Sequence, residues 1–194
     1  MKLFCLTGGI ACGKSTVLNR LKGRPNVETI EYDHIARRLL EETDMHVISE
    51  ILQARVDTNG KLDRRKFLRA LYADRERKNQ LERHFATPVW TKTEEQLHTM
   101  SDTALVVVES AIVYEAGIDH KFDAIIAATC SDKAQLRRLI TREGMSRVVA
   151  KRRIASQMLN AEKNARADFI INTECAEEVF NDEIDTIYYA LKMW

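Results

Sequence analysis

The sequence predicts an α/β fold in which a five-stranded parallel sheet is flanked by helices. Five short and nearly continuous apolar segments indicate strands that are buried on both faces, as they are in parallel sheets. Longer amphipathic segments separate these strands, and such alternation is typical of strand–helix–strand units. Scarce glycine and proline, seven and two residues, favour helices elsewhere, because both residues break helices. The predicted strands are residues 3–7, 27–30, 104–108, 124–129 and 169–171.

The composition is that of one compact globular domain. Hydrophobic residues make up 45% and charged residues 30% of the 194 positions, which is enough to build a sizeable core. The net charge is only +1, so no general field attracts nucleic acid or anionic lipid. No apolar run approaches the roughly 20 residues that cross a bilayer. We therefore expect a cytoplasmic protein, with a monomer favoured, and neither a membrane nor a nucleic acid as partner.

Two long helical regions interrupt the alternation. Residues 33–102 exceed a simple crossover, and we interpret them as a crossover helix followed by a helical substrate lobe, with a turn at 57–60. Residues 132–166 are rich in arginine and lysine around Gly144, and they predict either a mobile cationic hairpin or a solvated helix face. Residues 176–194 predict a packing helix with Val179, Phe180, Ile184, Ile187, Tyr188 and Leu191 at helical spacing.

A phosphate-binding loop is predicted between the first strand and a helix expected at 16–21. The segment GGIACGKS fits G-x-x-x-x-G-K-[S/T] in the strand–loop–helix context that the motif requires. Gly8 and Gly13 allow successive N–H groups to point at phosphate oxygens, and the helix amino terminus adds partial positive charge. Lys14 can reach the β- and γ-phosphates, and the Ser15 hydroxyl can bind Mg²⁺. The predicted nucleotide-binding residues of the loop are Gly9, Ile10, Ala11, Cys12, Gly13, Lys14, Ser15 and Thr16.

Two carboxylates follow predicted strands. Asp33 comes just after the second strand, where side chains of an open α/β sheet line the ligand crevice. It could accept the proton of an attacking hydroxyl, or it could cap a helix at 34–40, since aspartate is favoured at helix starts. Glu109 ends the apolar third strand, an arrangement that could hold Mg²⁺ directly or through water, although such patterns are common.

Other polar residues in these regions also have two interpretations. Arg138 and Arg142 lie one helical turn apart and, together with Arg137, could straddle a transferring phosphoryl group. Gly144 would permit the bend of a closing lid. Cys12 is either a redox-sensitive thiol, because a helix amino terminus lowers a thiol pKa, or simply a side chain small enough for the loop. The four cysteines and five histidines form no disulfide or zinc pattern.

The chain resembles the dephospho-CoA kinase family over nearly its whole length. The segments LTGGI and GKST are similar to the family's L-T-G-G-I-G-S-G-K-S-T opening, and YDHIAR is similar to D-A-D-x-I-A-R. Members phosphorylate the ribose 3′-hydroxyl of dephospho-CoA with ATP, the final step of coenzyme A synthesis. The resemblance implies a P-loop NTPase fold of the nucleoside-monophosphate-kinase type, ATP as co-substrate, Mg²⁺ as metal and dephospho-CoA as the small-molecule partner.

The resemblance also implies roles for single residues. Asp33 matches the family's proposed catalytic base, and Arg138 is expected to contact the phosphates; with Lys14 these are the expected catalytic residues. Arg142 and Asn172 join the nucleotide-binding set, Asn172 on the adenine side. The expected substrate-binding residues are Asp33, Arg64 and Glu115, and the expected metal-binding residues are Ser15 and Glu109.

The same resemblance divides the chain into three parts. The core would comprise residues 1–56, 103–131 and 167–194, the CoA-side lobe about 57–102, and the lid about 132–166. Glu31, Tyr32, Thr87 and Ala111 depart from the family pattern and bear on the individual CoA contacts. Another P-loop small-molecule or nucleotide kinase is the alternative, because the loop does not specify the acceptor. A regulatory nucleotide-binding module is a third hypothesis, which the missing guanine-binding motif [N/T]-K-x-D disfavours.

Overall fold

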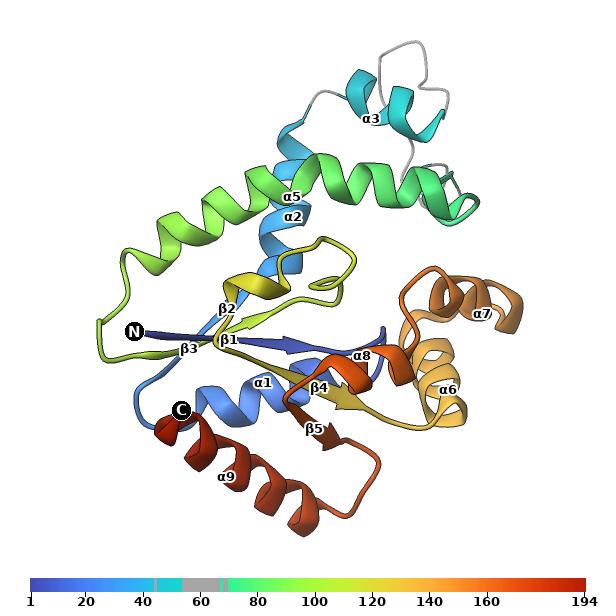
Figure 1. Ribbon diagram of the computed structural model, residues 1–194. Coiled ribbons are helices and arrows are strands. Elements are labelled where there is room, and N and C mark those ends of the chain that lie inside the picture. Colours follow the sequence, from blue (N-terminus) through green and yellow to red (C-terminus); the bar gives the residue numbers. More distant parts are fainter. Residues whose placement is uncertain (44, 54–66, 68–69) are drawn as a thin grey trace.

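The computed structural model describes residues 1–43, 45–53, 67 and 70–194, and it contains the predicted sheet (Figure 1). The sheet is parallel throughout, in the order β2-β3-β1-β4-β5. Arg64 and the turn predicted at 57–60 lie outside the described residues. The strands are β1 (Lys2–Thr7), β2 (Val27–Glu31), β3 (Leu105–Glu109), β4 (Ala124–Thr129) and β5 (Phe169–Asn172), each within two residues of its predicted bounds.

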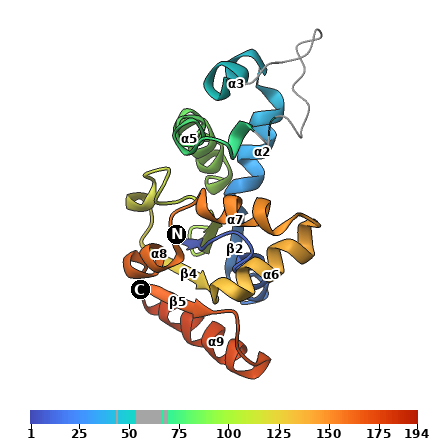
Figure 2. The same cartoon turned by 90° about the vertical axis from the view of Figure 1, so that its right-hand side faces the viewer.

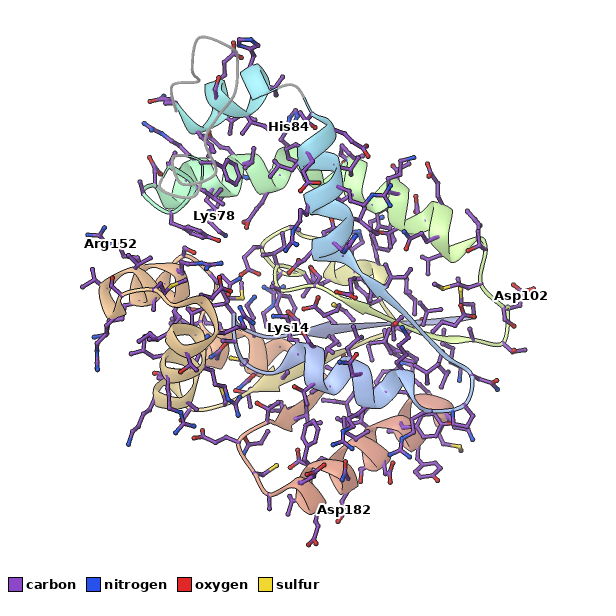
Figure 3. The ribbon with its side chains drawn as sticks, turned by 180° about the vertical axis from the view of Figure 1, so that it is seen from behind. Lys14, Lys78, His84, Asp102, Arg152 and Asp182 are labelled. Carbon is purple, nitrogen blue, oxygen red and sulfur yellow. The ribbon has the colours of Figure 1, made fainter. Side chains whose placement is uncertain are left out.

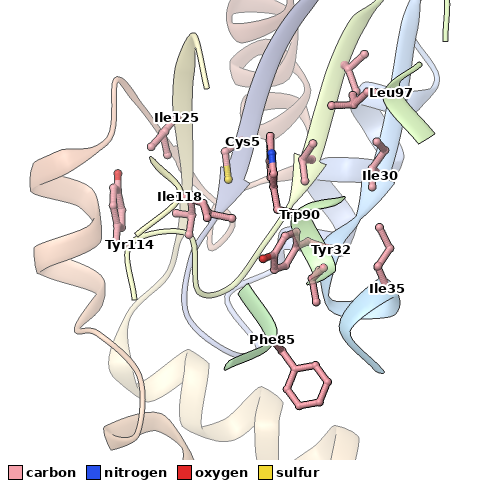
Figure 4. Close-up of a cluster of buried hydrophobic side chains, with 14 of the residues drawn as sticks. Cys5, Ile30, Tyr32, Ile35, Phe85, Trp90, Leu97, Tyr114, Ile118 and Ile125 are labelled. Atoms are coloured by element: carbon pink, nitrogen blue, oxygen red, sulfur yellow. The ribbon is translucent and has the colours of Figure 1, made fainter. Parts of the chain in front are cut away.

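Helices cover both faces of the sheet. On one face lie α1 (Lys14–Lys22) and α9 (Glu177–Met193), and on the other lie α2 (Tyr32–Glu42) and α5 (Arg75–Leu97) (Figure 1). Alternate residues of β1 serve the two faces: Phe4 and Leu6 pack with α1 and α9, whereas Cys5 packs with the opposite cluster. Figure 4 shows this second cluster, in which Tyr32 and Trp90 lie close to the strands. Burial on both faces explains the continuous apolar segments of the sequence.

Helix α9 confirms the predicted packing helix, with one exception. Phe180, Ile184, Ile187 and Leu191 are buried against the sheet and α1. Val179 is 49% exposed, and the expectation that it packs is therefore wrong. The buried residues of α9, Phe180, Ile184, Ile187, Tyr188 and Leu191, form one face of the helix, and Val179 lies more than about 100° from the centre of that face.

The remaining described helices pack on other helices or beside the sheet, with α8 (Asn160–Arg166) against β4. The short α3 (Met45–Leu52) packs against α5 at the top of the molecule (Figure 2). The arginine-rich region forms α6 (Asp132–Glu143), α7 (Arg147–Ala155) and α8, and a single 3₁₀ turn covers Asp119–Lys121. Within the described ranges, none of the helices has the length and apolar character needed to cross a membrane.

Local sequence sets the ends of the arginine-rich helices. The Ser131 and Ser146 hydroxyls cap α6 and α7 by accepting hydrogen bonds from the amides of Ala134 and Val149. Gly144 ends α6 in the left-handed conformation, with φ 63°. The bend predicted at this glycine is therefore present, and it turns α7 back onto α6.

Candidate active site

The loop between β1 and α1 has the backbone conformation that phosphate binding requires. Gly8 and Gly13 have φ of 140° and 90°, values that other residues rarely adopt. A Cβ at Gly8 would lie 2.2 Å from the carbonyl oxygen of Ala128, and one at Gly13 would lie 2.9 Å from the Thr173 side chain. Both glycines are therefore required by conformation and by space. Ala11 takes a left-handed conformation, φ 62°, without being glycine.

Side-chain amides from residues 135–160 hold the first half of this loop. The Gly9 amide donates to Asn160 Oδ1 at 3.1 Å, and the Ile10 amide donates to Gln157 Oε1 at 2.8 Å. Gln135 Nε2 donates to the Ile10 carbonyl oxygen at 2.9 Å, and Asn160 Nδ2 donates to Gln135 Oε1 at 3.0 Å. No role was predicted for these three amides, each of which lies at least 125 residues along the chain from the loop residue that it binds.

The second half of the loop and α6 enclose an open cavity of about 580 Å³. Its lining residues are Ala11, Gly13, Lys14, Ser15 and Thr16 from the loop, and Arg137, Arg138, Thr141 and Arg142 from α6. Three other described residues of the loop, Gly9, Ile10 and Cys12, do not line this cavity. Asn172 lies at the end of β5, where its Oδ1 accepts a hydrogen bond from the Glu174 amide at 2.9 Å. The structure thus brings together most of the predicted nucleotide-binding residues.

A smaller cavity of about 310 Å³ lies at the opposite ends of the strands. It is lined by residues that include Met1, Lys2 and Leu105, at the amino ends of β1 and β3. Open α/β sheets bind ligands at the carboxyl ends of their strands. The cavity beside the loop is therefore the candidate ligand site.

Arg138 is fixed in place by Thr173, just beyond β5. Its Nη1 donates to Thr173 Oγ1 at 2.8 Å, and its Nη2 donates to the Thr173 carbonyl oxygen at 2.7 Å. The Thr173 hydroxyl in turn donates to the Cys12 carbonyl oxygen at 2.8 Å. One hydroxyl therefore joins the arginine to the phosphate loop, a contact that the sequence did not reveal. Arg142 is more exposed and pairs with the neighbouring Glu143 at 2.8 Å.

Three carboxylates gather near Lys14 at the carboxyl ends of β2 and β3. Glu109 ends β3, Glu31 is its register partner on β2, and Asp33 lies in the first turn of α2. Lys14 is nearly buried at the centre of the molecule (Figure 3). Its Nζ lies 3.6 Å from Glu109 Oε1 and also donates to two carbonyl oxygens of the loop. The expected metal-side and base residues are thus neighbours of the expected catalytic lysine.

Burial raises the pKa values of two of these acids, Glu109 and Asp33. Burial, followed by the charge of Asp33, raises the pKa of Glu109 to about 7, although Lys14 opposes the rise. The Asp33 side chain is open to solvent, yet protein crowds around it, and this desolvation raises its pKa from the ordinary value against the effect of Lys14. Acids whose pKa values approach neutrality can exchange protons at working pH.

Helix α2 excludes one of the two interpretations of Asp33. The helix begins at Tyr32, one residue before the aspartate, and its N-cap position is Glu31. Asp33 therefore lies inside the first turn, and the capping alternative is wrong. Its side chain accepts a hydrogen bond from the Ala111 backbone and is reached by the charge of Lys14, and both lower its pKa against the effect of burial.

Glu115, expected on the substrate side, takes part in a buried ion pair. Lys163 on α8 is fully buried, and its Nζ lies 2.9 Å from Glu115 Oε1 and donates to the Ala111 carbonyl oxygen. The same Glu115 oxygen accepts a hydrogen bond from the Met158 amide at 2.9 Å. The pair holds α8 against the segment that follows β3. The charge of Lys163 also reaches Asp33, whose pKa it lowers.

The comparisons with known proteins agree with this geometry. A family profile described as dephospho-CoA kinase matches residues 2–178. The chain belongs to the dephospho-CoA kinase family. A dephospho-CoA kinase from Geobacillus kaustophilus is 31% identical to it over 193 residues, which cover 97% of this chain and 94% of the relative.

Two solved structures extend the match for this member of the dephospho-CoA kinase family. TT1252 from Thermus thermophilus superimposes with a TM-score of 0.80 at 26% identity, covering 97% of this chain and 96% of that one. A dephospho-CoA kinase from Campylobacter jejuni gives a TM-score of 0.66 at 26% identity, covering 100% and 98%. With the phosphate loop between β1 and α1, these matches confirm the predicted P-loop kinase fold.

Proposed function

We propose that this protein transfers the γ-phosphoryl group of ATP to the ribose 3′-hydroxyl of dephospho-CoA, giving coenzyme A. Membership of the family supports this function. The observation that carries it is the convergence of Lys14 with Asp33 and Glu109 beside a cavity lined by arginines. A cation for the phosphates and a carboxylate for the hydroxyl are the two groups that this reaction requires.

The cavity supports binding of the nucleotide phosphates. The amides of residues 11–15 lead into α1, which begins at Lys14 and whose helix dipole adds positive charge. Lys14 can balance charge between the β- and γ-phosphates. Arg138 is already oriented by two hydrogen bonds to Thr173, so little rotamer entropy remains to be lost when it contacts a phosphate. Arg142 would add charge at the outer wall, and Asn172 would lie toward the adenine.

Asp33 fits the role of the general base. Its raised pKa makes the carboxylate a stronger proton acceptor than an ordinary aspartate, and nearby Lys14 still favours the ionised form. Accepting the hydroxyl proton would also aim the oxygen at the γ-phosphorus. The acceptor would therefore enter from the side of α2 and α5.

The acid cluster fits a Mg²⁺ ion that arrives with ATP. Within the described ranges, no three His, Cys, Asp or Glu side chains form a metal cage of their own. Mg²⁺ usually takes one or two protein ligands and completes its shell with phosphate oxygens and water. The Ser15 hydroxyl and Glu109 would be those ligands; burial, followed by the charge of Asp33, raises the pKa of Glu109, and a bound cation would favour its ionised form. Bound Mg²⁺ would stabilise charge on the phosphate oxygens.

The substrate lobe and lid complete the proposal. We assign residues of about 57–102, including Arg64, to the CoA side, Glu115 to the acceptor side, and about 132–166 to a lid over the phosphates. The remaining segments form the core. We place the reaction in the cytoplasm and expect a monomer, which light scattering would test.

An acceptor panel tests the function directly. The purified protein is given ATP and Mg²⁺ with dephospho-CoA, with coenzyme A, whose 3′ position is already phosphorylated, or with shikimate and nucleoside monophosphates. We expect mass spectrometry to show a 3′-phosphorylated product from dephospho-CoA only. Efficient phosphorylation of another acceptor would establish the alternative of a different small-molecule kinase. ATP hydrolysis that needs no acceptor would establish the regulatory nucleotide-binding module instead.

A further inference from the structure

A pair of thiols lies behind the phosphate loop, on the side away from the cavity. Cys12 is completely buried, and its Sγ lies 3.7 Å from the Sγ of Cys130, which follows β4 and is 8% exposed. The two residues form a small buried cluster with Ala134 of α6. Asn160 Nδ2 donates to Cys12 Sγ at 3.4 Å. Two segments 118 residues apart in sequence are therefore joined by adjacent sulfur atoms.

The surroundings of this pair favour loss of one proton. The hydrogen bond from Cys130, together with Lys14 and Asn160, lowers the pKa of Cys12 to about 7, although burial acts in the opposite direction. The same hydrogen bond raises the pKa of Cys130 above that of an ordinary thiol. At neutral pH a substantial fraction of Cys12 is therefore thiolate beside the Cys130 thiol, and these are the two forms that disulfide formation uses.

We propose that Cys12 and Cys130 form an oxidative modification site, at which hydrogen peroxide produces an intramolecular disulfide that ties the phosphate loop to the end of β4. The proposal goes beyond the phosphoryl transfer assigned to the loop. It rests on the contact between the two sulfur atoms and on their position directly behind the loop amides.

The reaction balances in two steps. The Cys12 thiolate attacks one peroxide oxygen, the O–O bond breaks, and a sulfenic acid forms while hydroxide leaves. The Cys130 sulfur then attacks the sulfenic sulfur, the S–S bond forms, the S–O bond breaks, and the oxygen leaves as water. Overall, two thiols lose two electrons and two protons, and one peroxide is reduced to two water molecules. Because both thiols are buried, peroxide enters when the loop opens locally.

The disulfide would change the geometry of the loop. Disulfide sulfur atoms lie about 2.05 Å apart, whereas these atoms are 3.7 Å apart in the reduced protein. Cys12 is held on either side of its side chain, since its amide donates to the Gly9 carbonyl oxygen at 3.2 Å and its own carbonyl oxygen accepts from Thr173 at 2.8 Å. Drawing its sulfur toward Cys130 therefore displaces the amides that face the cavity. A displacement of about 1 Å in a catalytic site costs on the order of 100-fold in rate.

Peroxide treatment of a Cys175→Ser protein tests the proposal, because this substitution removes the most accessible of the four thiols. We expect non-reducing peptide mapping to show a Cys12–Cys130 cross-link and ATP affinity to fall roughly 10-fold or more, because one lost hydrogen bond to a charged phosphate oxygen costs about that much. Dithiothreitol should remove the cross-link and restore the ATP affinity. In the matched Cys175→Ser, Cys130→Ser protein we expect normal ATP binding before oxidation and no cross-link after it.

Two results would overturn the inference. In the first, both thiols are still alkylated by N-ethylmaleimide after peroxide treatment and denaturation. In the second, the cross-link forms but ATP affinity is unchanged. The readouts are peptide mass and nucleotide binding, neither of which requires an acceptor. A protein that forms the cross-link but does not phosphorylate dephospho-CoA would therefore contradict the proposed function and leave the thiol site intact.

Discussion

Replacement of Glu109 by glutamine should make the protein more resistant to unfolding at alkaline pH. In the unfolded chain this carboxyl group ionises near 4.5, whereas burial and the charge of Asp33 keep it protonated up to about pH 7 in the folded protein. The folded state therefore binds more protons between these two values, and stability falls as the pH rises through this window. Below pH 4.5 the penalty is absent, and above about pH 7 it is complete. Glutamine cannot ionise and carries no such penalty.

The size of the effect follows from the two pKa values. A rise from 4.5 to about 7 corresponds to about 3 kcal/mol, at about 1.4 kcal/mol for each pH unit. Glu109 is only 7% exposed, so solvent screening reduces this little. We compare the free energy of unfolding of Glu109→Gln with that of the unsubstituted protein at each pH. The difference should grow in favour of Glu109→Gln by about 3 kcal/mol between pH 4.5 and pH 8.

Urea denaturation at several pH values measures this difference, with fluorescence of Trp90 and Trp194 as the signal. Glu178→Gln is a matched control, because that carboxylate is exposed on α9 and keeps its hydration. Its effect should vary little with pH. A Glu109→Gln protein whose relative stability is flat across the same range would show that Glu109 is ionised without cost, and the account of the acid cluster would be wrong.

Four further substitutions test the site. Asp33→Asn should lower kcat roughly 10² to 10⁴-fold with little change in melting temperature, because asparagine cannot accept the proton; full activity would remove Asp33 as the base. Lys14→Met should lower turnover by about 10² to 10³-fold, and near-normal turnover of the folded variant would exclude its role at the phosphates. Arg138→Ala should lower kcat more than it raises KM for ATP; the reverse would make Arg138 a ground-state binder. Thr173→Val removes the hydroxyl that holds Arg138 and should lower kcat, whereas Thr173→Ser keeps a hydroxyl and should keep kcat near normal. Equal losses of kcat in the two variants would refute this positioning role.

The sheet and the phosphate loop could be predicted because their signals are local. A strand buried on both faces appears as a continuous apolar segment, and the spacing of Gly8, Gly13 and Lys14 is fixed by the loop itself. The start of α2 could not be read in the same way. Aspartate favours both the cap and the first turn of a helix, and only the backbone shows that the helix begins at Tyr32.

The contacts that support the site could not be predicted, because they join distant parts of the chain. Gln157, Asn160 and Thr173 reach the loop from more than 140 residues away, and nothing in their own neighbourhoods marks them. In the sequence Lys163 is one of many charged residues in a segment that could be a solvated helix face, yet it is fully buried and paired with Glu115. Fold topology, rather than local pattern, decides which of many similar polar residues meet.

The central position of β1 also affects how the protein is made. This strand is synthesised before both of its partners in the sheet, β3 and β4, which begin at residues 105 and 124. During translation it must therefore leave the ribosome as an unpaired apolar segment, of the kind that chaperones protect from aggregation. A nascent chain that ends after β4 could pair β1 on both sides, but it would still lack Gln157, Asn160 and Thr173. The nucleotide site is consequently assembled only after residue 173 has been synthesised.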